Sequence, residues 1–86
     1  MSGTDWKPAV GDVVRARTHI SKYIPKGSIG LIERTEGNGN FKPNAYVLWR
    51  RGVCCSTYYE HIKPAKPESL SRSQRLWVVK TLMNGL

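Results

Sequence analysis

Basic and aromatic side chains are interleaved through much of the chain, and this combination is suited to binding a nucleic acid. Cations can follow the phosphates of a strand while aromatic faces stack on its bases, as RNA or single-stranded DNA binding requires. The candidate nucleic-acid-binding residues are Arg15, Arg17, Lys22, Tyr23, Lys26, Lys42, Arg50 and Arg51. The other interpretation is that these cations are only solvated and that Tyr46 or Trp49 belongs to the core.

The charge balance of the chain indicates what kind of partner it could attract. The 86 residues include 14 Lys and Arg against 6 Asp and Glu, a formal net charge of +8. Such an excess favours nucleic acid, an acidic protein surface or an anionic membrane as partner. It could equally serve only to keep a small protein in solution.

The sequence shows no recognisable catalytic or metal-binding motif. There is no G-x-S-x-G, no phosphate-binding loop and no pair of carboxylates placed for acid–base work. Cys54 and Cys55 are adjacent, so in a strand their sulfurs point to opposite faces and share neither a disulfide nor a metal. His19 and His61 have no metal-ligand spacing. We therefore expect no enzyme, no cofactor, no metal and two free thiols, as in a reducing compartment.

Short alternating segments separated by turn residues predict a mainly β domain. Gly11-Asp12 should turn the chain into a first strand, Gly27 should do the same before the second, and Arg51-Gly52 should form a tight hairpin. Gly30, inside the second strand, should permit a close approach or a sharp bend. The expected strands are 12–17, 28–34, 45–49, 53–58 and 62–63, with one helical turn at 59–61. The expected core is Val14, Ala16, Ile29 or Ile32, Val47 and Cys55.

The C-terminal part changes to a helical period. Ser71 and Gln74 match a capping box, which predicts a helix over 72–84. Because Leu76, Val79 and Met83 recur at helical spacing, we expect them to pack on the sheet domain. Trp77 falls off that face, and together with Arg72 and Arg75 it forms a candidate partner-binding site. The helix could instead dock on another protein or pair with itself.

The opening of the chain resembles the KOW motif of ribosomal proteins and NusG-type transcription factors. The matching residues are Gly11-Asp12-Val13-Val14-Arg15, and then Lys26-Gly27-x-x-Gly30-x-Ile32. The resemblance implies a five-stranded SH3-like barrel over residues 10–64, with nucleic-acid contacts in the loops 18–26 and 37–44. The remaining parts would be a flexible lead-in at 1–9, a linker at 65–70 and a C-terminal amphipathic helix at 71–86.

One enzyme with an SH3-like barrel offers a catalytic alternative, the plasmid-borne reductase that resists trimethoprim. It carries a Val-Gln-Ile-Tyr run late in the barrel, whereas the corresponding stretch here, Ser56-Thr-Tyr-Tyr59, lacks the Gln and the Ile. The sequence does not favour that activity.

These observations predict a non-enzymatic basic binding module that acts on a nucleic-acid machine: RNA, the ribosome or a transcription complex. The alternative is a protein-only adaptor or a regulatory or structural subunit that docks through the barrel loops and the C-terminal helix. The sequence leaves open whether a cell or a phage encodes it. No apolar run reaches the roughly 18 residues of a membrane helix, and the N-terminus carries no signal core, so we expect a cytoplasmic protein. The sequence leaves the oligomeric state open.

Overall fold

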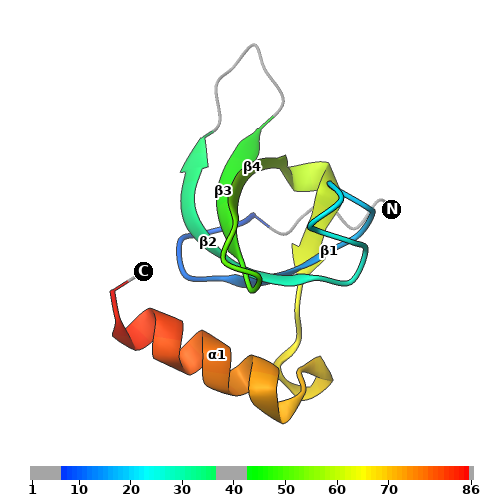
Figure 1. The fold of residues 1–86 in the computed structure, drawn as a ribbon. Coiled ribbons are helices and arrows are strands. Elements are labelled where there is room, and N and C mark those ends of the chain that lie inside the picture. The colour runs from blue at the N-terminus through cyan, green and yellow to red at the C-terminus, as the bar shows by residue number, and fades with distance from the viewer. Residues whose placement is uncertain (1–6, 37–42, 86) are drawn as a thin grey trace.

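The computed structural model describes residues 7–36 and 43–85, which form one antiparallel sheet of five strands followed by a helix (Figure 1). The strand order is β4-β3-β2-β1-β5. This confirms the predicted mainly β fold with one C-terminal α-helix. The elements are β1 Val13–Ala16, β2 Ile29–Glu36, β3 Asn44–Trp49, β4 Cys54–Tyr58, η1 Tyr59–His61, β5 Ile62–Pro64, η2 Pro67–Ser69 and α1 Arg72–Met83.

The core lies against the concave face of the sheet, where every second residue of the central strands is buried. In β3, burial alternates with the strand period, so that Ala45, Val47 and Trp49 point inward. On β2 the inward residue is Ile32, which pairs with Val47. The core cluster consists of Val14, Ala16, Ile24, Ile32, Ala45, Val47, Trp49 and Ile62. This set confirms the expected Val14, Ala16, Ile32 and Val47, and Cys55 packs partly buried against it.

The second strand is buried on both of its faces. Ile29 and Leu31 are 2% and 0% exposed although they alternate with the core residue Ile32. Because directly paired residues share a face of the sheet, Leu31 lies beside Val13 and Leu48 on the convex side. A second layer must therefore cover this side, and the C-terminal helix lies there (Figure 1).

Gly30 faces the core opposite Trp49. A Cβ atom at this position would lie 2.5 Å from Val47 Cγ1 and 2.8 Å from Trp49 Cε3. The Leu48 carbonyl oxygen of the neighbouring strand would lie 3.2 Å from it, so two side chains and one backbone atom make the close approach expected from the sequence. The irregularity in the β2–β3 ladder falls further along, between Ile32 and Arg34.

The sheet curves around the core, and its two edge strands, β4 and β5, are joined by the single turn η1 (Figure 1). Within residues 7–36 and 43–85, no ladder connects β4 with β5, so the hydrogen-bonded sheet is open at that edge. The structure thus confirms five antiparallel strands but not a closed barrel. None of the helices in these ranges is long and apolar enough to cross a membrane.

The helix begins at the predicted capping box. The backbone N–H of Gln74 donates to Ser71 Oγ at 3.2 Å, and the backbone N–H of Ser71 donates to Gln74 Oε1 at 2.8 Å. Two of the free N–H groups at the helix start are thereby satisfied. The predicted helix start and the helical period are both confirmed.

The predicted packing face of the helix is wrong. Leu76, Val79 and Met83 are 62%, 54% and 81% exposed, whereas Val78 is buried. The half-buried Gln74, Trp77 and Thr81 share the side of Val78, at helical spacing. Two hydrogen bonds connect the start of the helix to the rest of the fold in this rotation. Arg15 Nη2 of β1 donates to Ser69 O at 3.3 Å, and Arg50 Nη2 of the β3–β4 turn donates to Ser73 Oγ at 3.2 Å.

Two polar side chains of the packed side, Gln74 and Thr81, each make a hydrogen bond within the capped helix, which lowers the cost of partly burying them. The Thr81 hydroxyl donates to the Trp77 carbonyl at 2.7 Å, and the Gln74 side chain is used in the cap. Burying a satisfied polar group costs much less than burying a free one. A prediction from hydrophobicity alone therefore chose the wrong side of α1 as the one that packs on the sheet.

Candidate functional site

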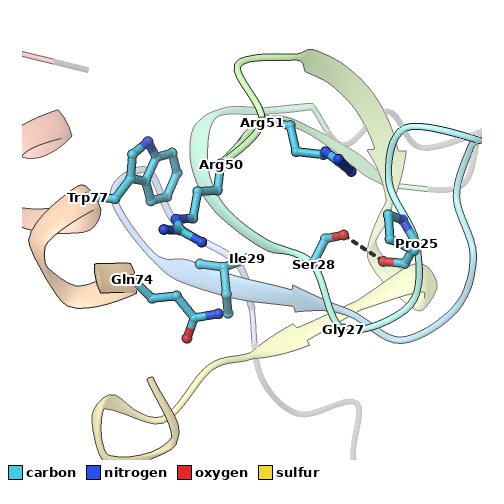
Figure 2. A pocket seen from close by; sticks show the side chains of 8 residues that line it. All are labelled: Pro25, Gly27, Ser28, Ile29, Arg50, Arg51, Gln74 and Trp77. Atoms are coloured by element: carbon cyan, nitrogen blue, oxygen red, sulfur yellow. Dashed lines mark hydrogen bonds between the residues drawn. The ribbon is translucent and has the colours of Figure 1, made fainter. Parts of the chain in front are cut away.

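An open pocket of about 550 Å³ lies between the helix and the convex side of the sheet (Figure 2). Three segments distant in the sequence contribute to it: the loop before β2, the β3–β4 hairpin and the first turns of α1. Its lining residues are Pro25, Gly27, Ser28, Ile29, Arg50, Arg51, Gln74 and Trp77.

The loop side of the pocket is fixed by a tight turn. Gly27 has a φ of +93°, a left-handed conformation that favours glycine, and its N–H donates to the Ala16 carbonyl at 2.9 Å. The Ser28 hydroxyl donates to the Pro25 carbonyl at 2.6 Å (Figure 2). Arg15 Nη1 donates to the Gly27 carbonyl at 3.0 Å. The loop therefore presents a rigid wall.

The hairpin side carries the two arginines. Gly52, with a φ of +90°, closes the predicted turn, and its N–H donates to the Trp49 carbonyl at 2.8 Å. The turn projects Arg50 and Arg51 to the pocket, where both are exposed (Figure 2). Arg50 N also donates to the Ile29 carbonyl at 2.8 Å, which fixes the hairpin to β2.

The helix side supplies an aromatic ring and an amide. The Trp77 indole is half-buried and stands beside Arg50 (Figure 2). The Gln74 side-chain oxygen accepts from Ser71 N, so its amide nitrogen is the end that can donate to a ligand.

The charge of the pocket is entirely positive. None of its eight lining residues is acidic, and two are arginines. Lys26, between the lining residues Pro25 and Gly27, is exposed but does not line the pocket. It is a third cation beside the two arginines of the hairpin. Guanidinium groups beside an indole and the apolar Ile29 can hold a ligand that combines an anionic group with a planar ring.

The structure brings together part of the predicted basic set. Arg50 and Arg51 line the pocket, and Lys26 belongs to its loop. Arg17, Lys22 and Tyr23 are exposed but do not line it, and Lys22 Nζ lies 5.0 Å from the centre of the Tyr23 ring. Arg15 is engaged in hydrogen bonds within the protein. Lys42 lies outside the described residues.

The predicted partner site of the helix is divided. Trp77, expected to stand exposed beside Arg72 and Arg75, is instead half-buried in the pocket wall. Arg72 and Arg75 are exposed and do not line the pocket. Sequence reasoning missed Gln74 as a lining residue, because its capping motif gave no sign of the helix rotation.

Two aromatic residues of the strands are accounted for inside the fold. Trp49 is fully buried in the core, where its indole N–H has no hydrogen-bond partner among residues 7–36 and 43–85. Tyr46 is half-buried, and the Arg34 guanidinium lies 4.3 Å from the centre of its ring. The sequence left open whether Tyr46 or Trp49 belongs to the core, and in the structure the core residue is Trp49.

The two cysteines are free and differ in burial, as the strand alternation predicted. The exposed Cys54 thiol donates to Glu33 Oε1 at 2.8 Å. Partial desolvation, this hydrogen bond and the charge of Glu33 raise the pKa of Cys54 to about 11. In the part of the chain that is described, no three His, Cys, Asp or Glu side chains converge as metal ligands.

Comparison with protein-family models, with curated proteins and with solved structures finds no match to this chain.

Proposed function

We propose that this chain is a non-enzymatic binding module that contacts single-stranded nucleic acid, RNA in the first instance, as part of a ribosomal or transcription complex. The proposal includes an SH3-like barrel of the KOW type and a cytoplasmic location. The single observation that carries it is the pocket that Arg50, Arg51 and Trp77 line together with no acidic residue (Figure 2).

The roles of the side chains follow from their geometry. Arg51 is exposed and can bind a phosphate, while Arg50 donates one hydrogen bond to Ser73 and can offer its remaining donors. The indole of Trp77 offers a surface on which a base can stack. A pocket of about 550 Å³ lies within the size range of small-ligand sites, so it can hold one nucleotide of a strand.

The test is a titration of a labelled single-stranded RNA, followed by fluorescence anisotropy at several salt concentrations. Each phosphate contact contributes a slope of about −0.7 in log K against log salt, so three contacts from Arg50, Arg51 and Lys26 predict about −2. Arg51→Ala should weaken binding to all sequences alike and flatten the slope by about 0.7.

The matched control is Arg17→Ala, which removes an exposed arginine that does not line the pocket. It should change the affinity much less than Arg51→Ala. Equal losses in the two variants would indicate diffuse attraction to a basic surface. No binding at low salt, where the +8 charge helps most, would contradict the proposal.

A second measurement locates the ligand. In a ¹⁵N-labelled sample, the indole N–H signal of Trp77 should shift on addition of RNA, whereas that of the buried Trp49 should stay in place. A signal of Trp77 that does not move in a saturated complex would exclude the pocket as the contact.

A further inference from the structure

The side of α1 that faces away from the sheet is exposed, and beyond Arg72 at its first turn it is apolar. Leu76, Val79, Leu82 and Met83 are 62%, 54%, 43% and 81% exposed, and we call them the outer stripe. The opposite side of the same helix packs through Val78 and lines the pocket. The outer stripe is therefore a surface separate from the proposed nucleic-acid site.

The spacing of the outer stripe is that of a helix–helix seam. Leu76, Val79 and Met83 are separated by three and four residues, as the a and d positions of a heptad are. On that register, Arg75 and Lys80 take the flanking g and e positions, which select a partner by charge. α1 has 12 residues, and the seam from Leu76 to Met83 is about 10 Å long.

The charges beside the seam discriminate between possible occupants. The helix contains no Asp or Glu. Of its flanking g and e positions, Arg75 and Lys80 are cationic, and the other two are Ser73 and Leu82. Arg72 takes the d position before Leu76, so every charge in or beside the seam is positive. Two copies of this chain would bring Arg75 and Lys80 against equally basic flanks, with no acid on either helix to pair with them. A helix with acidic flanks would instead form ion pairs on both sides of the seam.

We propose that the outer stripe docks an acidic amphipathic helix of a partner protein. The partner's apolar a and d residues would pack on Leu76, Val79 and Met83, and its Glu or Asp residues at e and g would face Arg75 and Lys80. This proposal does not depend on nucleic-acid binding. If both hold, the chain joins a nucleic acid to an acidic protein through opposite sides of one helix.

The test uses a designed peptide of about three heptads, with Leu at a and d and Glu at e and g. A matched peptide carries Lys at e and g. Titration calorimetry on the full chain should show binding of the Glu peptide and none of the Lys peptide. Val79→Asp, in the centre of the seam, should weaken binding by about tenfold or more.

Val10→Asp is the matched control, because Val10 is also an exposed valine, at 63%, but lies outside the helix. It should leave the affinity for the Glu peptide unchanged. Arg75→Glu should weaken binding of the Glu peptide and introduce measurable binding of the Lys peptide, a reversal that a general loss of structure cannot produce.

Four outcomes would overturn the proposal. The Glu peptide could fail to bind, or Val79→Asp could bind it as well as the wild type does. Sedimentation could show that the protein alone dimerises and that Val79→Asp abolishes the dimer, which would make a second copy the occupant. Co-sedimentation with phosphatidylserine vesicles that Val79→Asp abolishes would make a lipid surface the occupant.

Discussion

The guanidinium of Arg15 donates to the carbonyl of Gly27 at 3.0 Å. The same side chain reaches Ser69 just before α1, so it connects β1, the pocket loop and the approach to the helix. A cation that the sequence assigns to a ligand surface therefore positions the walls of the site. We therefore expect Arg15 to contribute mainly to the stability of the fold and to affect ligand binding only through the position of the pocket walls.

Replacing Arg15 should destabilise the fold. Arg15→Ala removes charge-assisted hydrogen bonds to two segments and should lower the free energy of unfolding by about 1 to 2 kcal/mol. Arg17 follows β1 directly and is exposed, so Arg17→Ala should change the free energy of unfolding by less than about 0.5 kcal/mol. Urea denaturation followed by circular dichroism measures both. Equal effects would show that the Arg15 bonds contribute nothing.

Much of the fold could be predicted because local patterns determine it. The alternation in β1 and β3, the glycine turns before β2 and after Arg51, and the Ser71 capping box are short-range signals. The choice between Ile29 and Ile32 could not be made from the sequence, because both are buried, one on each face of β2. The helix that covers Ile29 lies more than forty residues further along.

Two neighbouring valines test which side of the helix packs. Val78→Asp places a charge where a side chain is 8% exposed and should cost about 2 kcal/mol or more. Val79→Asp places the same charge where the side chain is 54% exposed and should cost less than about 0.5 kcal/mol. Thermal or urea unfolding of the two variants distinguishes them. A larger cost at Val79 would restore the face expected from hydrophobicity.

Gly30 should tolerate no side chain. Gly30→Ala forces a methyl group against Val47 and Trp49 and should cost about 1 to 3 kcal/mol. Adding Val47→Ala removes one of the two clashing atoms, so the double variant should lose less than the sum of the single losses, by about 1 kcal/mol. Strict additivity in equilibrium unfolding would mean that Val47 does not crowd this position.

The candidate site was less predictable than the fold because its walls come from three segments. Sequence reasoning found Arg50, Arg51 and the aromatic Trp77, but it placed the tryptophan in a different site from the arginines. Trp77 lines the same pocket as the two arginines only in this rotation of α1, and the hydrogen bond between Arg50 and Ser73 stabilises that rotation. A bond between residues 23 positions apart leaves no local sequence signal.

The thiol of Cys54 should react slowly despite its exposure. Only the thiolate is nucleophilic, and the pKa of Cys54 is raised from 9.0 to about 11. At pH 8 the thiolate fraction should therefore be about a hundredfold below that of an ordinary thiol. Iodoacetamide labelling measures this in a Cys55→Ala variant, because the two adjacent cysteines share every proteolytic peptide. The same variant in denaturant provides the reference rate.

The pH dependence separates the causes of this shift. The labelling rate of the native protein should rise towards a midpoint near pH 11, and Glu33→Gln should move the midpoint down by removing a negative charge beside the thiol.

The raised pKa also predicts how Cys54 affects stability at alkaline pH, because the folded state keeps the thiol proton to a higher pH than the unfolded state does. The thiol therefore reduces stability as pH rises from about 9 towards 11 and has no such effect below that range. Cys54→Ala should remove this part of the alkaline destabilisation. A native labelling midpoint near 9 would show that neither burial nor Glu33 raises the pKa of this thiol.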